Sequence, residues 1–159
     1  MKPMLPTERI AAITLDQHSM SHRNKQVEHE RNVALTDLLH DNSFSLVGQE
    51  CGPYTVALRV EENRLIFEIT GQGQESAQRI SLPVGPLKST IRDYFLICES
   101  YYAALKDAKP HKLEAIDMGR RGIHNEGSEL LKSLLSERIG VDFATARRLF
   151  TLVCVLHLK

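Results

Sequence analysis

Residues 54–70 have the sequence YTVALRVEENRLIFEIT, and this stretch decides the fold class. Every second residue is apolar from position 54 to 60 and again from position 65 to 69, and most residues between them are polar. Glu62 and Asn63 interrupt this pattern. A period of two residues is typical of a β-strand with one dry face and one wet face. The interruption at Glu62 and Asn63 predicts a tight turn. The stretch therefore predicts two neighbouring strands of an antiparallel sheet.

The same alternation continues on both sides of this hairpin. Phe44 and Leu46 alternate before it, Ile80 and Leu82 alternate after it, and residues 9–15 form a weaker candidate strand. An antiparallel sheet with one wet face needs a cover for its dry face. The residues expected on that dry face are Phe44, Val56, Leu58, Leu65, Phe67 and Ile69.

Helical spacing of apolar residues appears before and after the strands. Helices are predicted over residues 27–41, from Pro86 to about residue 105, and from Pro110 to about residue 118. A further helix is marked by the leucines of residues 130–135 and ends at Gly140, and the last helix covers residues 143–158 with Asp142 as N-cap. These elements predict an α+β fold in one domain spanning residues 1–159, with residues 1–8 as a flexible leader. The expected architecture is a two-layer sandwich, in which an antiparallel sheet of four to five strands is covered on one face by helices. The helix that begins near Pro86 is expected to provide this cover.

Charge and cysteine content limit the possible classes of protein. The formal net charge is zero, so nothing global attracts the chain to nucleic acid or to an anionic membrane. The longest apolar stretch, residues 149–158, is too short for a membrane span. The three cysteines have no paired spacing, and Cys98 and Cys154 are expected to be buried thiols. These features predict a protein without disulfides in the reducing cytoplasm.

Residues 119–128, GRRGIHNEGS, form the strongest candidate site. The glycines predict a turn that leads into a helix, whose exposed backbone N–H groups attract an anion. Arg120 and Arg121 would add forked donors for phosphate or carboxylate, and Asn125 would lie beside the ligand. In the structural alternative, the arginines bind carbonyls of the preceding helix and Asn125 is only a cap.

His124 and Glu126 are the candidate catalytic residues of the same segment. An imidazole beside a helix N-terminus favours its neutral form and exchanges protons near neutral pH. Glu126 would orient the imidazole or act as a base. The alternative is that Glu126 only complements the helix dipole.

Arg147 and Arg148, on the polar side of the last helix, are further candidate ligand-binding residues. Together with Arg120, Arg121, His124, Tyr101 and Tyr102 they belong to the helical half, and their convergence would form an electropositive cleft. The alternative is that these side chains form a salt-bridged surface. The last helix is apolar on nearly all sides, so it is either central to the fold or part of a homodimer interface.

A second cluster consists of His18, His22, Glu28 and His29, with His40 further on. Imidazole and carboxylate groups can bind zinc, but the spacing is irregular. The pattern favours a solvated helix face over a metal site, with a contact to the Arg-rich segment as a further alternative. No metal and no cofactor is predicted.

Several long sequence segments indicate a resemblance to a protein family. They are VEHER at residues 27–31, DYFLICESYY at residues 93–102, EAIDMGRRGIHNEG at residues 114–127 and DFATARRLFTL at residues 142–152. The chain resembles a bacterial family known as uncharacterised protein family 0262, from residue 10 to residue 158. This resemblance implies no established activity, cofactor or catalytic residue.

Three functions fit these observations. The first is a binding or regulatory module that recognises an anionic ligand or a protein. The second is an enzyme acting on a phosphorylated or carboxylated metabolite, which Arg120 and Arg121 hold while His124 or Glu126 moves a proton. The third is a nucleic-acid binder, against which the lack of a recognition motif and of a strongly basic face argues.

Overall fold

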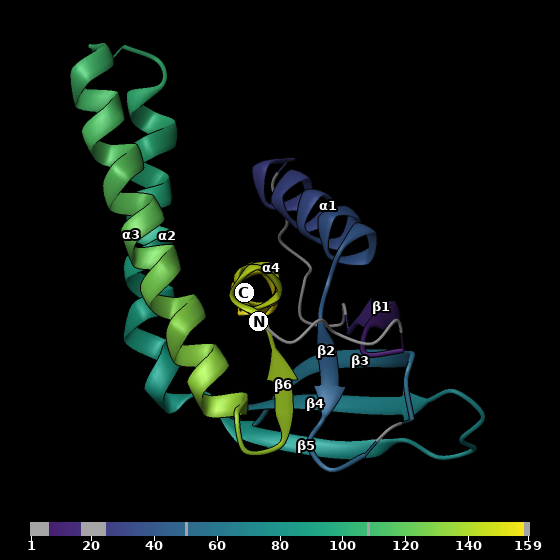
Figure 1. The fold of residues 1–159 in the computed structure, drawn as a ribbon. Helices are drawn as coiled ribbons and strands as arrows, with labels where there is room; N and C mark the ends of the chain where they lie inside the picture. The colour runs from purple at the N-terminus through teal and green to yellow at the C-terminus, as the bar shows by residue number, and fades with distance from the viewer. Residues whose placement is uncertain (1–6, 17–24, 50, 108, 158–159) are drawn as a thin grey trace.

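The computed structural model of the chain describes residues 7–16, 25–49, 51–107 and 109–157. Its elements are, in chain order, β1 (Ile10–Leu15), α1 (Lys25–His40), β2 (Phe44–Leu46), β3 (Tyr54–Glu61), β4 (Arg64–Gly71), β5 (Gln78–Pro83), α2 (Gly85–Ala104), α3 (Pro110–Leu135), β6 (Ile139–Val141) and α4 (Phe143–Leu156). The predicted α+β class is confirmed, and the helices lie on one side of the sheet (Figure 1).

The main sheet has the strand order β1-β3-β4-β5. Strands β3, β4 and β5 are antiparallel, as predicted. Glu62 (φ 51°) and Asn63 (φ 61°) form the predicted tight turn between β3 and β4. The expectation of a purely antiparallel sheet is wrong for β1, which pairs with β3 in parallel. The chain passes through α1 between these two strands, and such a crossover returns it in the same direction.

The dry face of the sheet is buried as predicted. Phe44, Val56, Leu58, Leu65, Phe67 and Ile69 are each at most 1% exposed. However, β2, which carries Phe44, does not join the main sheet. It pairs antiparallel with β6, a short strand that the sequence did not predict.

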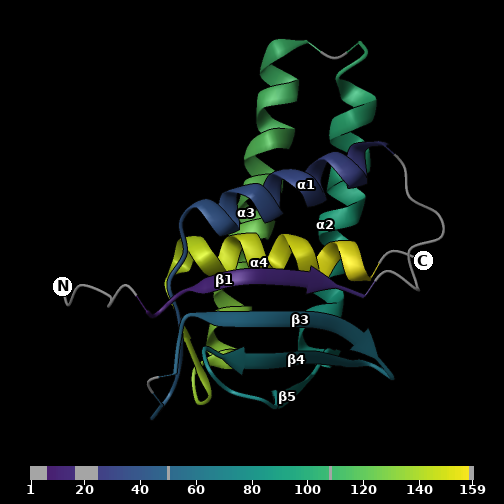
Figure 2. The ribbon, with the colours of Figure 1, turned by 90° about the vertical axis from the view of Figure 1, so that its right-hand side faces the viewer.

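The helix that lies on the sheet is α4, which runs along β1 and β3 (Figure 2). The prediction that the helix starting near Pro86 provides the cover is wrong. Instead, α2 packs against α3 in a hairpin that stands up from the sheet (Figure 1). The physical reason is that α4 is apolar on nearly all sides, so it can lie between the sheet and the other helices. Leu149, Leu152 and Val153 are fully buried within the single chain, and the helix is therefore central to the fold.

The predicted turn at residues 119–128 is wrong, because α3 continues through it as one helix of 26 residues. Its glycines serve close packing. A Cβ at Gly127 would overlap the ring of Phe150 on α4. A Cβ at Gly119 would lie 2.9 Å from Cδ1 of Ile97 on α2. The backbone N–H groups near Asn125 therefore belong to a helix interior, and the predicted anion seat at a helix N-terminus does not form there.

All three cysteines are free thiols. Cys98 and Cys154 are buried, as predicted, and Cys51 is half-buried. In the described part of the chain, no helix is both long enough and apolar enough to cross a membrane.

Candidate functional site

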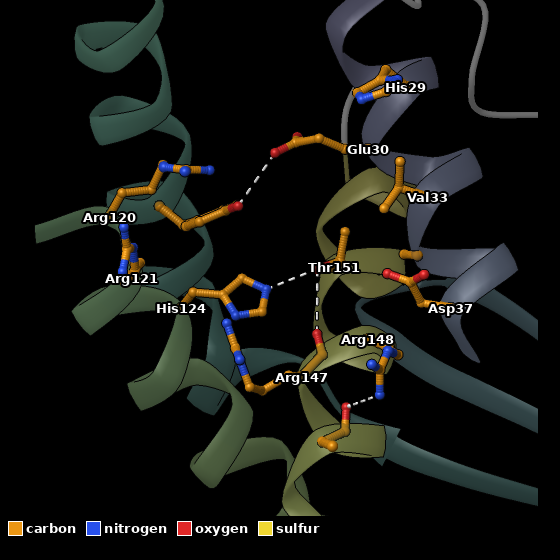
Figure 3. Close-up of a pocket in the computed structure, with 13 residues that line it drawn as sticks. His29, Glu30, Val33, Asp37, Arg120, Arg121, His124, Arg147, Arg148 and Thr151 are labelled. Carbon is orange, nitrogen blue, oxygen red and sulfur yellow. Dashed lines mark hydrogen bonds between the residues drawn. The ribbon is translucent and has the colours of Figure 1, made fainter. Parts of the chain in front are cut away.

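A cavity of about 340 Å³ opens between α1, α3 and α4, with Tyr94 of α2 in its wall (Figure 3). Pockets that bind small molecules have volumes of about 300–1,000 Å³, so this cavity suits a small metabolite. The lining residues are His29, Glu30, Val33, Ala34, Asp37, Tyr94, Arg120, Arg121, His124, Ala144, Arg147, Arg148 and Thr151.

Two arginines of α3 are held by one carboxylate on their own helix. Asp117 Oδ1 accepts hydrogen bonds from Nε and Nη2 of Arg120, at 3.1 and 2.6 Å. Asp117 Oδ2 accepts from Nε and Nη2 of Arg121, at 3.0 and 2.5 Å. These hydrogen bonds lower the pKa of Asp117. The Arg120 guanidinium also lies 4.6 Å from the ring centre of Tyr101. The cationic groups are thus positioned before any ligand binds.

Two arginines of α4 complete the cationic wall. Arg148 Nη1 donates weakly to the Ala144 carbonyl, at 3.4 Å. Arg147 is exposed, and within the residues that the structure describes its guanidinium makes no ion pair. Its charge nevertheless reaches the pocket, because it lowers the pKa of His124. The structure therefore brings together the four candidate arginines from both helices (Figure 3).

His124 forms the wall between the pocket and the core. Its Nε2 is 2.8 Å from Oγ1 of Thr151, and its ring lies edge-on to Tyr94 and Phe150, with centroids 5.2 Å apart in both pairs. Burial, with the charges of Arg147 and Arg120, lowers its pKa to about 4. The imidazole is therefore neutral at neutral pH.

The third wall comes from α1 and is acidic. Glu30 and Asp37 line the pocket from this side, beside His29 and Val33 (Figure 3). The Glu30 carboxylate accepts a hydrogen bond from the Tyr94 hydroxyl at 3.4 Å. Burial raises the pKa of Glu30, although the charge of Arg120 and the hydrogen bond from Tyr94 oppose the shift.

Comparison with known proteins identifies the family. The model described as "Uncharacterised protein family (UPF0262)" matches residues 7–159. The chain belongs to this family. A UPF0262 protein of Azorhizobium caulinodans is 51% identical over 156 residues, which cover 97% of this chain and 96% of the relative. One of Hyphomonas neptunium is 49% identical, with 94% and 92% covered, and one of Brucella canis is 53% identical, with 96% of both covered. No solved structure matches the chain.

The family resemblance seen in the sequence is thus confirmed, and the relatives' names state no activity. In this UPF0262 family member, the pocket is the feature that indicates a function.

Two of the predicted site residues do not contribute to the pocket. Asn125 and Glu126 are exposed on α3 and do not line the pocket. In the continuous helix α3, Asn125 and Glu126 are rotated by about 100° and 200° from His124, which faces the pocket. Asn125 follows Arg121 by one turn at the exposed edge of that face.

The histidine cluster has a mixed outcome. His18 and His22 lie outside the described residues. His29 lines the pocket that Arg120 and Arg121 also line, and a direct contact between the two segments stays a prediction. Among the residues that the structure describes, no group of three His, Cys, Asp or Glu side chains is arranged to hold a metal ion.

The acidic wall is the part of the site that sequence reasoning missed. Glu30, Val33 and Asp37 follow one another at intervals of three and four residues, so they share one face of α1. The buried positions Ala34 and Leu38 lie directly beside this face. Two acidic residues next to a buried stripe, Glu30 and Asp37, are the signal that could have indicated the wall, because such residues lie at the edge of a packed interface.

Proposed function

We propose that this protein is a binding or regulatory module that holds a small anionic metabolite in the pocket between α1, α3 and α4. The observation that carries the proposal is the convergence of Arg120, Arg121, Arg147 and Arg148 on one cavity of about 340 Å³. Guanidinium groups bind carboxylate and phosphate through paired, charge-assisted hydrogen bonds. The ligand must be small, since the cavity volume is near the lower limit for ligand pockets.

Arg147 is the central residue of this proposal. Arg120 and Arg121 already share Asp117, whereas Arg147 makes no ion pair in the described part of the chain. A charge that has no protein partner and borders a cavity is available to a ligand. The anionic group should therefore bind between Arg147 and Arg148, with the outer N–H groups of Arg120 as additional donors.

The free cysteines support a location in the cytoplasm. All three are thiols, and Cys51 is half-buried rather than enclosed by the core. Disulfides form and persist mainly in oxidising compartments, whereas the cytoplasm keeps thiols reduced. Small metabolites with phosphate or carboxylate groups would be available to the protein in that compartment.

The alternative is an enzyme acting on the same class of ligand. The raised pKa of Glu30 favours this alternative, because it shifts the titration of the carboxyl toward neutral pH. This carboxyl lines the same pocket as the arginines. Such a group can exchange protons with a bound substrate. In this alternative Glu30 takes the role that the sequence suggested for Glu126, and His124 acts as a neutral hydrogen-bonding group.

The proposal is tested by measuring thermal shifts with orthophosphate, succinate and glycerol 3-phosphate, at constant ionic strength. We expect at least one of them to raise the melting temperature of the wild type. Loss of a charge-assisted hydrogen bond costs about 1.5–3 kcal/mol, so Arg147→Ala should weaken binding by roughly ten- to a hundredfold. Arg79→Ala is the matched control, since Arg79 is exposed on β5, away from the pocket.

The comparison of the two variants decides the outcome. Specific binding requires that Arg147→Ala loses the shift while Arg79→Ala keeps it. Equal shifts in both variants would show that the anion acts by general screening. A wild type that none of the three anions stabilises would remove the proposal.

A further inference from the structure

The pocket has two walls of opposite charge that face each other. Arg120, Arg121 and Arg147 form one wall, Glu30 and Asp37 of α1 form the other, and Arg148 is drawn on the side of Asp37 (Figure 3). The arginines of α3 pair with Asp117 on their own helix. In the described ranges no ion pair connects the α1 carboxylates with any of the four arginines. The two walls therefore remain charged toward the cavity.

The acidic wall would be a disadvantage for a site that binds only anions. A carboxylate close to a bound phosphate or carboxylate repels it, and this repulsion is stronger at a partly buried site than in water. The hydrogen bond that Glu30 accepts comes from Tyr94, an uncharged phenol. Burial of the Glu30 carboxylate is costly, because the charge of Arg120 and the hydrogen bond from Tyr94 offset its desolvation only in part. A cationic group of the ligand placed against Glu30 would lessen both disadvantages.

We infer that the ligand is a zwitterion, a small molecule that carries an ammonium group together with a carboxylate or phosphate. This inference rests on the proposed function and specifies its ligand. The anionic end binds at Arg147 and Arg148, and the ammonium group binds at Glu30. Asp37 lies two helical turns further along α1 and adds its negative charge to the same wall. The cavity of about 340 Å³ holds a molecule of the size of an amino acid or an amino-alkyl phosphate.

The aromatic side chain at the acidic wall fits this assignment. The Tyr94 hydroxyl donates to Glu30 and so orients the carboxylate. An ammonium group then receives charge-assisted hydrogen bonds from an oriented acceptor, which costs little reorganisation. The acidic wall also selects against plain anions, because they leave its two charges unpaired.

The test compares ligands that differ only in the amino group. The probes are aspartate against succinate, and O-phosphoethanolamine against ethyl phosphate, measured by calorimetry near neutral pH and at constant ionic strength. We expect the wild type to bind the amino member of at least one pair about tenfold tighter than its partner. In Glu30→Gln this preference should fall several-fold, and in Asp37→Asn it should fall by less, while binding of succinate and ethyl phosphate is unchanged or tighter in both variants.

Matched variants separate this inference from the proposed function. Glu114→Gln removes an exposed carboxylate of α3 outside the pocket and should keep the preference. Arg147→Ala should weaken both members of each pair. Equal or tighter binding of the amine-free members by the wild type overturns the zwitterion and leaves the anion site standing. If neither member of any pair binds, the proposed function fails, and this inference fails with it.

Discussion

His124 shows what a single buried side chain contributes to the pocket. Its ring nitrogens face the hydroxyls of Thr151 and Ser128, at 2.8 and 3.5 Å, and its ring is only 8% exposed. A general acid must carry its proton at the working pH, whereas this imidazole has a pKa of about 4. His124 therefore serves as a neutral part of the wall that holds Thr151 in place. The neutral form expected from the sequence fits this environment, and a neutral imidazole does not act as a general acid.

The depressed pKa of His124 predicts that stability depends on pH. The native imidazole has a pKa of about 4, and that of the unfolded chain is near 6.5, so between these values the unfolded state binds more protons. Stability is then highest above the unfolded pKa and falls as the pH drops toward 4. Between about pH 7 and pH 5 the loss attributable to His124 is roughly 2 kcal/mol.

The measurement is urea unfolding at both pH values, for the wild type and for His124→Gln. The variant lacks the titrating group, so its free energy of unfolding should change less between the two pH values by roughly 2 kcal/mol. An equal pH dependence in the two proteins would contradict a buried, neutral His124.

At the scale of elements, α3 determines the geometry of the site. One continuous helix places Arg120, Arg121 and His124 on neighbouring faces, toward α1 and α4. The sequence analysis named these three residues as site candidates but assigned them to a turn. Glycine is a poor helix former, by about 1 kcal/mol relative to alanine, so local propensity favours an interruption here. Packing overrides it, and the packing partners Ile97 and Phe150 are known only once α2 and α4 are placed.

This role of the glycines predicts opposite effects of the same substitution at two positions. A Cβ at Gly127 would overlap the Phe150 ring, whereas a Cβ at Gly122 meets no atom within 4 Å. Gly127→Ala should destabilise the protein by about 1–3 kcal/mol, because overpacking outweighs the gain in helix propensity. Gly122→Ala should be neutral or stabilise by up to about 1 kcal/mol. Denaturant midpoints of the two variants provide the check.

The comparison also tests whether α3 is continuous. If residues 119–128 formed a turn, alanine would be unfavourable at both glycines. Destabilisation by Gly122→Ala as large as that by Gly127→Ala would therefore contradict the helix and restore the turn.

At the scale of the whole molecule, the sequence specified which residues are buried better than how the elements are connected. The hairpin of β3 and β4, its turn and its dry face follow from a period of two residues, which is a local property. The parallel pairing of β1 and the separate pair of β2 and β6 join segments far apart in the chain. Such pairings depend on where α1 and α4 pack. The acidic wall was missed for the same reason, because Glu30 and Asp37 line a pocket only when α1 packs beside α4.

The central position of α4 predicts that a charge introduced into this helix prevents folding. Leu152 is fully buried within the single chain, whereas Leu96 on α2 is 56% exposed. An unpaired buried charge costs about 3–5 kcal/mol, against a typical total stability of about 5–15 kcal/mol. Leu152→Asp should therefore abolish or nearly abolish cooperative folding at every protein concentration. Leu96→Asp introduces the same charge on the surface and should leave the melting temperature almost unchanged.

Circular dichroism melting and sedimentation of the two variants decide between a core helix and an interface helix. A helix that formed a dimer interface would lose its partner when Leu152 becomes Asp, but each chain would stay folded. A folded, monomeric Leu152→Asp protein beside a dimeric wild type would therefore contradict the core role. Because the main sheet, α1 and α3 already cover the apolar sides of α4, the expected result is unfolding instead.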